Sequence, residues 1–179
     1  MRQATIERKT TETAVSVAIG LDGKGEGRID TSVPFLDHML NLFARHGLVD
    51  LDTAIDNHHL VEDVGICLGQ AVRRALGDRK GISRYGSAVV PMDESLCSVA
   101  MDLSGRPYLI WNADFSEGMI GGFDPALLKE FFKSFSDHGG ITLHINLLYG
   151  TNLHHMAEAI FKAFARAMRV RRLVADMAR

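Results

Sequence analysis

The 179-residue sequence lacks the features that mark secreted and membrane proteins. It has only two cysteines, Cys67 and Cys97, and both lie in apolar stretches without the spacing of a disulfide framework or a metal site. We therefore expect two reduced, buried thiols in a cytoplasmic protein. The N-terminus has no apolar signal region, and no segment approaches the roughly 18 apolar residues of a membrane helix. A membrane is therefore not an expected partner.

A large net charge is missing as well. The 20 lysines and arginines nearly balance the 22 aspartates and glutamates, which gives a formal net charge of −2. This balance gives no reason to expect nucleic acid as a partner. The contents of 46% hydrophobic and 23% charged residues are typical of a globular protein, and low-complexity segments are absent. A chain of this length forms one domain or two small fused repeats.

The most informative pattern is a histidine doublet followed after two residues by a glutamate, at residues 58–62 and again at residues 154–158. Each copy precedes an amphipathic run, so each is predicted near the start of a helix, where its three polar side chains can face one point. Two imidazoles and a carboxylate there favour a divalent metal such as zinc, iron or manganese. The alternative, a polar helix start with capping and solvated groups, is disfavoured by the repetition. The candidate ligands are His58, His59 and Glu62, and His154, His155 and Glu158.

The predicted elements follow the same order twice. The first set is a strand pattern in residues 5–20, a short strand at 28–31, a helix from Pro34 closed by Gly47, a strand at 48–55 and a helix that ends at Gly77. The second set is strands at 85–92, 96–103 and 108–115, a helix at 124–138, a strand at 141–148 and a last helix from the second doublet. We interpret both as β-β-β-α-β-α and predict an α+β fold with internal duplication, each half a small sheet with helices on one face. The predicted halves are residues 1–80 and 81–179, packed as one unit.

Corresponding helix ends set the register between the halves. Arg-His-Gly at residues 45–47 matches Asp-His-Gly at 137–139, and this places Glu130 opposite His38. Each half then offers four possible ligands, and two such sets imply two metals. Sites at subunit interfaces would let neighbouring copies share ligands, which predicts a homo-oligomer whose assembly needs metal. The sets are His38, His58, His59 and Glu62 in the first half, and Glu130, His154, His155 and Glu158 in the second.

The second half also carries a cation beside its ligands. Lys162 follows the second doublet on the same helix face, whereas the equivalent position of the first half is Ile66. A cation there could hold an anionic substrate tail, and Arg84 and Arg106, both next to turns, could join it because guanidinium makes paired hydrogen bonds to phosphate. For each of the three the alternative is a solvated surface charge. Only their association with the histidine clusters favours an anion site.

Five segments resemble the imidazoleglycerol-phosphate dehydratase family, namely residues 8–13, 35–40, 58–63, 104–108 and 154–163. The resemblance implies a duplicated fold like the second domain of ribosomal protein S5, two manganese ions per active site at subunit interfaces, and trimers that build a shell of about 24 subunits. It implies as metal ligands His38, His58, His59, Glu62, His154, His155 and Glu158. It implies that Arg84, Arg106 and Lys162 hold the phosphate and that Glu12 and His46 line the substrate site.

The implied reaction is the dehydration of imidazole glycerol phosphate to imidazole acetol phosphate in histidine biosynthesis. It removes hydroxide from carbon 3 and a proton from carbon 2, and the carbon-2 hydrogen is not acidic by ordinary standards. An imidazole with both ring nitrogens bound to manganese becomes an imidazolate that can expel the hydroxide. A carboxylate such as Glu12 can then act as the catalytic proton-transfer group. Asp93 and Glu94 are further candidates for proton transfer, although a carboxylate of an ordinary turn is the default interpretation.

The sequence departs from the family pattern at three points. Glu130 stands where the family has a metal-ligating histidine, a change of about one unit in site charge that also alters metal preference. The segment 50–58 is shorter than its counterpart, and the sequence stops at Arg179 without the family's Ser-Lys-Gly tail. These departures leave two interpretations open: a C-terminally truncated member of the family, or a divergent relative that uses the same metals on a different small anionic substrate. A separate alternative is a non-catalytic assembly in which metals cross-link subunits.

Overall fold

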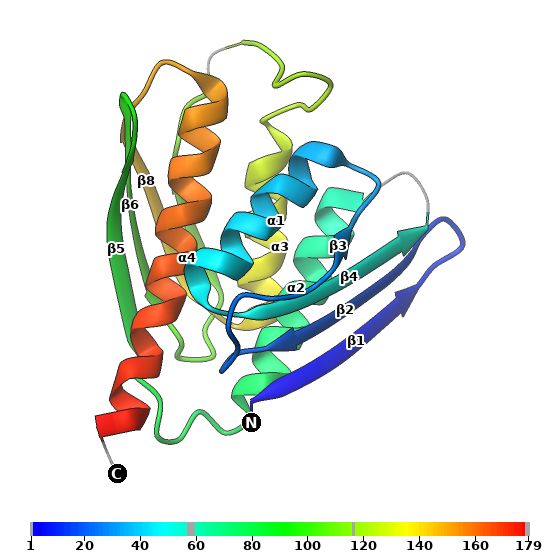
Figure 1. Cartoon of the computed structure of the whole chain (residues 1–179), viewed down its shortest axis with the longest axis vertical. Coiled ribbons are helices and arrows are strands. Elements are labelled where there is room, and N and C mark those ends of the chain that lie inside the picture. Colours follow the sequence, from blue (N-terminus) through cyan, green and yellow to red (C-terminus); the bar gives the residue numbers. More distant parts are fainter. Residues whose placement is uncertain (1, 57–59, 116, 178–179) are drawn as a thin grey trace.

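The computed structural model describes residues 2–56, 60–115 and 117–177, which form eight strands and four helices (Figure 1). In chain order they are β1 (Gln3–Lys9), β2 (Ala14–Gly20), β3 (Ile29–Asp30), α1 (Pro34–Gly47), β4 (Asp50–Asp56), α2 (Leu60–Leu76), β5 (Tyr85–Met92), β6 (Ser95–Asp102), β7 (Tyr108–Asn112), α3 (Leu127–Gly139), β8 (Thr142–Tyr149) and α4 (Leu153–Met177). The predicted order β-β-β-α-β-α is therefore present twice. The alternating pattern in residues 5–20 is a hairpin of two strands, β1 and β2.

The two sheets have the same topology. The first has the strand order β1-β2-β4-β3 and the second β5-β6-β8-β7. In each, two antiparallel pairings are followed by one parallel pairing at the last strand. The registers also correspond, since Gly20 pairs with Asp50 in the first sheet and Asp102 pairs with Thr142 in the second. The internal repeat is therefore visible in the structure, while a boundary between residues 80 and 81 stays a prediction.

The four helices lie between the two sheets, so each sheet turns one face to the helices (Figure 1). Helix α2 packs on β1 and β2, and α4 packs on β5 and β6. The other two helices cross over, because α1 packs against α4 and α3 packs against α2. Each helix pair therefore combines one helix from each repeat, and this exchange decides which site residues meet.

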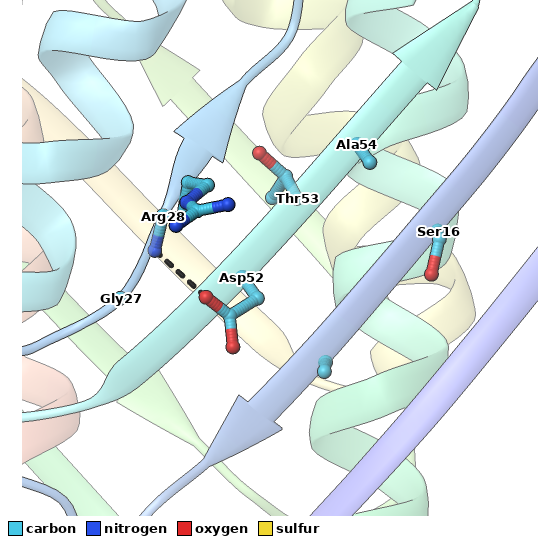
Figure 2. Close-up of a pocket in the computed structure, with 7 residues that line it drawn as sticks. Ser16, Gly27, Arg28, Asp52, Thr53 and Ala54 are labelled. Atoms are coloured by element: carbon cyan, nitrogen blue, oxygen red, sulfur yellow. Dashed lines mark hydrogen bonds between the residues drawn. The ribbon is translucent and has the colours of Figure 1, made fainter.

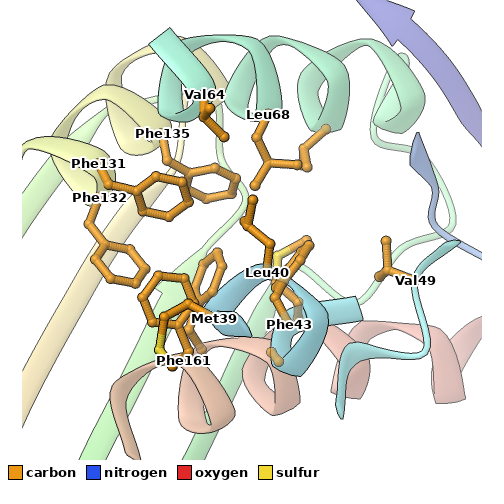
Figure 3. Close-up of a cluster of buried hydrophobic side chains, with 14 of the residues drawn as sticks. Met39, Leu40, Phe43, Val49, Val64, Leu68, Phe131, Phe132, Phe135 and Phe161 are labelled. Carbon is orange, nitrogen blue, oxygen red and sulfur yellow. The ribbon is translucent and has the colours of Figure 1, made fainter. Parts of the chain in front are cut away.

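The helices enclose one hydrophobic core that both repeats share. Figure 3 shows side chains from all four helices converging in it, among them Met39, Leu40, Val64 and Leu68. Phe43 of α1 stacks on Phe164 of α4 with ring centroids 5.2 Å apart. Aromatic side chains supply the largest apolar area per residue, so this layer contributes strongly to stability. Its fully buried phenylalanines are Phe43, Phe131, Phe132, Phe135, Phe161 and Phe164.

Helix ends depart from the prediction in small ways. Helix α1 has Pro34 at its start as expected, but the left-handed residue after it is Leu48, with φ of 51°, and not the predicted Gly47. The equivalent residue after α3 is Gly140, with φ of 61°. Helix α3 begins at Leu127 rather than near residue 124, because residues 124–126 form a turn whose carbonyl at Asp124 accepts the Leu127 N–H.

Both cysteines are buried and free, as predicted. Burial raises the pKa of Cys67 to about 11 and that of Cys97 to about 12, so both thiols are protonated at neutral pH. Among the helices that the structure describes, none is long and apolar enough to cross a membrane.

Candidate metal centre

Helices α1 and α4 bring three possible metal ligands to one point. Glu158 Oε1 lies 3.0 Å from Nε2 of His38 and 3.0 Å from Nε2 of His154. One ligand atom from each of these residues lies within 4.8 Å of the others. Two imidazole nitrogens and a carboxylate oxygen at this separation suit a divalent ion of intermediate hardness, such as manganese, iron or zinc. The residues present therefore fit the predicted metal.

Local structure explains why these side chains converge. His154 and Glu158 are four residues apart on α4 and so share one helix face. The start of α4 is fixed by Asn152, whose Oδ1 accepts the backbone N–H of His154 at 2.9 Å. The His154 ring also meets Phe35 edge-on, with centroids 5.3 Å apart. His38 and His154 expose 45% and 42% of their side chains, so the cluster opens to solvent and is accessible to a ligand.

Glu158 is held in its ionised form. Burial alone would raise the pKa of Glu158, but hydrogen bonds from Lys162 and His38 and the charge of Lys162 outweigh this effect and bring the pKa to about 2. The Lys162 ammonium lies 2.6 Å from Glu158 Oε2, one helical turn along α4. It also lies 3.1 Å from Met92 Sδ on β5. A carboxylate ready to bind metal and a cation next to it are therefore both present.

The grouping of ligands by sequence half is wrong for His38. The sequence placed it with Glu62 and the first doublet, but α1 packs against α4, so His38 joins His154 and Glu158 of the other repeat. The physical reason is that helix pairing is a long-range choice, which the periodicity of either helix does not encode.

The other helix pair carries the remaining carboxylates. Helices α2 and α3 run in the same direction, since Gly65 approaches Phe131 and Gly69 approaches Phe135. Their first turns, with Glu62 and Glu130, therefore begin at the same end of the pair, and both side chains are exposed. Glu130 also lines a surface hollow with Trp111. The predicted ligands His58 and His59 lie outside the described residues.

His155 is turned away from the cluster formed by its neighbour. Its Nδ1 lies 2.8 Å from Glu94 Oε2, in the turn between β5 and β6. The hydrogen bond with this carboxylate raises the pKa of His155, and the same bond, with backbone N–H donors of residues 151 and 152, holds the pKa of Glu94 well below its usual range. The two histidines of the second doublet therefore have different partners: His154 contacts Glu158, and His155 contacts Glu94.

The two predicted phosphate-binding arginines meet at an aspartate that sequence reasoning missed. Arg84 donates two hydrogen bonds to Asp102, at 2.6 and 2.9 Å, and Arg106 donates one at 3.4 Å. The hydrogen bond from Arg84 is the main reason that the pKa of Asp102 is lowered. A signal was available, because Tyr85 pairs with Asp102 across the β5–β6 hairpin and so places Arg84 beside it. The structure does not join this pair to Lys162, which contacts Glu158 instead.

Glu12 occupies the exposed turn between β1 and β2. Within the described residues its carboxylate accepts no hydrogen bond, although its backbone N–H donates to Thr10 Oγ1. The turn is anchored next to Glu62, because Thr13 Oγ1 donates to Asp63 Oδ2 at 2.7 Å and Arg8 Nε donates to Asp63 Oδ1 at 2.9 Å. Glu12 is therefore placed near the start of α2 with its carboxylate available.

His46 lies two turns further along α1 than His38 and is half-buried. Burial lowers the pKa of His46, and the charges of Lys162 and Arg166 on α4 lower it further. His46 is therefore neutral at neutral pH and borders the basic side of α4.

A hollow of 530 Å³ on the outer face of the first sheet contains none of the predicted site residues (Figure 2). It is lined by small side chains, such as Ser16 and Ala54, and by Asp52, which already accepts the backbone N–H of Arg28 at 2.7 Å. We therefore assign no role in the site to this hollow.

Comparison with known proteins identifies the family. The family described as imidazoleglycerol-phosphate dehydratase matches residues 31–168, a range that includes α1 and the part of α4 that bears the ligands. The chain belongs to the imidazoleglycerol-phosphate dehydratase family. The resemblance of the sequence motifs is thereby confirmed, and the chain is an enzyme of the hydro-lyase class.

Members of the dehydratase family are similar over nearly the whole chain. The imidazoleglycerol-phosphate dehydratase of Syntrophus aciditrophicus is 61% identical over 175 residues, which cover 94% of this chain and 89% of the relative. The dehydratase of Pelobacter propionicus is 58% identical over 173 residues, with coverage of 93% and 89%.

Solved dehydratase structures show the same fold. The crystal structure of the Staphylococcus aureus dehydratase superposes with a TM-score of 0.85 at 39% identity and covers 94% of this chain and 97% of that chain. The Pyrococcus furiosus structure has a TM-score of 0.82 at 37% identity, with coverage of 93% and 92%. The predicted α+β fold with its repeated halves is confirmed.

Proposed function

We propose that this chain dehydrates imidazole glycerol phosphate to imidazole acetol phosphate in histidine biosynthesis, at a site with two manganese ions assembled between subunits of a homo-oligomer. The observation that carries the proposal is the cluster of His38, His154 and Glu158 on two helices of a family member. Family membership supports the reaction, and the cluster supports the use of a metal.

The first ion would be held by Nε2 of His38 and of His154 and by the carboxylate of Glu158. The second would be held by the first doublet with Glu62, by His155 and by Glu130, with the ligands divided between neighbouring copies. Two ions bound by these residues would supply positive charge that stabilises the negative charge developing on the substrate imidazole ring. Glu130 in place of a histidine makes the second site one charge more negative, which favours a hard ion such as manganese.

The phosphate group would be held by Lys162 and by the pair Arg84 and Arg106. Asp102 neutralises one of the two guanidinium charges and holds both groups in place, so the pair keeps one net positive charge for an anion. Lys162 lies a single helical turn from Glu158, which suits a small substrate whose ring is at the metal and whose phosphate is a few bonds away.

A single chain does not supply both parts of this phosphate site to one substrate. Lys162 contacts Met92 at the last residue of β5, whereas Arg84 precedes the first residue of this strand, eight residues or about 26 Å away at roughly 3.3 Å per residue. A small phosphorylated imidazole does not span that distance. The arginine pair of one copy would therefore meet the metal cluster of another. This argument supports a homo-oligomer, and we propose the trimers and the shell of about 24 subunits that the family resemblance implies.

Glu12 would transfer the proton from carbon 2, because its carboxylate is available and its turn is anchored to the start of α2. His46, held neutral beside Lys162, would line the substrate site and add a hydrogen-bonding group without a further positive charge. In this proposal the residues of the chain bind the substrate, orient it and transfer a proton.

The experiment that tests the proposal is a turnover assay of metal-free protein reconstituted with manganese, with imidazole glycerol phosphate as substrate and imidazole acetol phosphate as the measured product. Metal content is measured on the same sample. Product formation with two manganese ions per chain supports the proposal. Filled metal sites without product would favour the alternative of a different small anionic substrate, for which Glu130 in place of the family histidine is the supporting observation. Absence of bound manganese would contradict the metal site itself.

A further inference from the structure

Glu94 lies at the tip of the β5–β6 hairpin and has a counterpart at the tip of β1–β2. The pair of Gly20 with Asp50 in the first sheet corresponds to the pair of Asp102 with Thr142 in the second. Glu12 lies eight residues before Gly20 and Glu94 lies eight residues before Asp102, so the two glutamates occupy equivalent positions. The residues that follow them, Thr13 and Ser95, are both buried polar residues. Each hairpin tip meets the start of the helix that packs on its own sheet, α2 in one case and α4 in the other.

The two oxygens of the Glu94 carboxylate accept hydrogen bonds from different groups. Oε1 accepts the backbone N–H groups of Thr151 at 3.2 Å and Asn152 at 2.8 Å, together with the Ser95 hydroxyl at 3.0 Å. Oε2 accepts one hydrogen bond, from Nδ1 of His155 at 2.8 Å. The Thr151 hydroxyl is a fourth donor to Oε1, at 3.5 Å. With Oε1 held by these four donors, the carboxylate cannot rotate freely, and Oε2 stays aimed at the imidazole.

This arrangement determines which imidazole nitrogen of His155 carries the proton. An ionised carboxylate can only accept hydrogen bonds, so Nδ1 must be the donor. A neutral imidazole protonated at Nδ1 has its lone pair on Nε2, and that is the nitrogen left to bind a metal. The Nε2 atom takes no part in the hydrogen bond with Glu94, and among the described residues it forms an ion pair with Asp93 Oδ2 at 3.7 Å. His155 exposes 29% of its side chain, so this nitrogen can be reached.

We propose that Glu94 is a positioning residue that fixes His155 in the tautomer with a free Nε2 and orients this nitrogen to bind manganese where two copies of the chain meet. The inference rests on the proposed function, because it assumes that His155 is a ligand. A role as helix cap alone does not explain the geometry, since Asn152 already caps α4 by accepting the N–H groups of His154 and His155. His154, by contrast, has its Nε2 at the Glu158 cluster and no contact with Glu94 among the described residues.

The variant that tests this role is Glu94→Gln, which keeps the shape of the side chain but has one acceptor and one donor. With its oxygen on the backbone N–H groups of residues 151 and 152, its NH₂ group faces Nδ1 of His155 and donates to it. The imidazole proton then moves to Nε2, which removes the lone pair that binds a metal. Nitrogen-15 solid-state NMR of histidine-labelled, metal-free protein at alkaline pH reports the tautomer, with the His155 signal assigned by its loss in His155→Asn.

We expect the wild type to show His155 protonated at Nδ1 and Glu94→Gln to show it protonated at Nε2. We also expect the manganese affinity of one of the two sites to fall by 10- to 100-fold in Glu94→Gln, the usual effect of losing the carboxylate behind a histidine ligand. The matched control is Asn152→Ala, which removes a helix cap and leaves Glu94 and His155 in place. It should lower the thermal unfolding temperature yet keep the tautomer and the manganese affinity close to wild type.

Glu94→Gln with the Nδ1 proton retained would overturn the proposal. A manganese affinity that falls no further than in Asn152→Ala would do the same, because Glu94 would then act only through the stability of α4. Wild-type protein that binds no manganese would contradict the proposed function instead, and the tautomer comparison, which needs no metal, would still decide whether Glu94 positions His155.

Discussion

The two helix pairs of this chain, α1 with α4 and α3 with α2, are equivalent in topology but not in chemistry. The first pair combines His38 with a carboxylate of α4 and places Lys162 against that carboxylate. At the corresponding positions the second pair has Glu130 in place of His38 and Ile66 in place of Lys162. The repeat therefore kept its backbone while its two copies acquired a mixed imidazole and carboxylate cluster in one place and a more acidic surface in the other.

The same pairs also differ in how closely they pack. Helix α2 approaches α3 through glycines, since a Cβ on Gly65 would lie 2.5 Å from the Phe131 carbonyl oxygen. The position equivalent to Gly65 in α4 is Phe161, which is fully buried in the aromatic layer. One pair is therefore held by backbone contact and the other by large side chains, so equal substitutions in the two pairs should have unequal effects.

The largest effect is expected from Glu158→Gln, which removes the carboxylate shared by α1 and α4. Loss of this ligand should lower manganese affinity at the cluster by at least about 100-fold, because even changes behind a ligand cost 10- to 100-fold. Turnover should fall below detection. Manganese content after dialysis and turnover on the same sample measure both quantities.

The matched variant in the other pair is Glu62→Gln. It should lose the second ion and keep the ion at the cluster of His38 and His154, so about one manganese per chain should remain in each variant. Loss of both ions in either variant would show that the two helix pairs do not hold separate ions.

A smaller effect, on stability, is expected from two single substitutions at equivalent positions, Gly69→Ala in α2 and Ala165→Gly in α4. In Gly69→Ala the new Cβ would lie 2.6 Å from the Phe135 carbonyl oxygen, so the helices must separate, and the free energy of unfolding should fall by about 2 kcal/mol. Ala165→Gly should cost about 1 kcal/mol, chiefly through helix propensity. Denaturant unfolding of metal-free protein measures both. A cost for Gly69→Ala at or below that of Ala165→Gly would contradict the close approach of α2 and α3.

A third comparison concerns pH and Lys162, which α4 carries at the position where α2 has Ile66. The pKa of Glu158 is lowered from its usual 4.5 to about 2 in the folded protein, so this carboxylate stabilises the fold above about pH 4.5, and the contribution is lost as the pH falls from 4.5 towards 2. In Lys162→Met the hydrogen bond and charge that lower this pKa are removed, so the folded-state pKa rises towards 4.5. The acid-induced loss of stability should therefore become smaller and be complete at a higher pH. Urea unfolding of metal-free protein across this pH range measures it. The control is Lys133→Met, which breaks an exposed ion pair with Asp137 and should leave the pH dependence of the unfolding free energy unchanged. An unchanged pH dependence in Lys162→Met as well would contradict a contribution of the Lys162 contact to the pKa of Glu158.

Much of the fold was predictable because its signals are local. The repeated doublets, the helix starting at Pro34 and the matching His-Gly helix ends were enough to predict the β-β-β-α-β-α order and the duplication. The exchange of helices between repeats was not predictable, because it depends on how side chains far apart in the chain fill one core. His38 was assigned to the wrong partners for that reason.

The candidate site was predictable to a similar extent. Ligand-type residues and the three cations could be named from spacing and resemblance, but their contacts could not. Glu94 meets His155 across 61 positions of sequence, through a turn and the start of a helix that no periodicity connects. Asp102 could have been found from the hairpin register, since Tyr85 pairs with it and Arg84 is adjacent. Glu94 was named from the sequence as a candidate for proton transfer, but its contact with His155 was not predicted. The contacts of carboxylates that act through another residue are therefore the part of a site that pattern alone misses most easily.

The smallest effect is expected from making the two helix pairs alike with Glu130→His, which restores the residue type found at His38. The change removes one negative charge and adds a softer ligand, so manganese affinity should change by less than about tenfold while the preference for zinc over manganese increases. Competition between the two metals, followed by metal analysis, measures this preference. The control Lys129→His places the same side chain at the neighbouring exposed position, where it should leave the metal ratio unchanged. If the metal ratio is unchanged in Glu130→His as well, Glu130 binds no metal. The site at α2 and α3 would then consist only of the first doublet, Glu62 and ligands from a neighbouring copy.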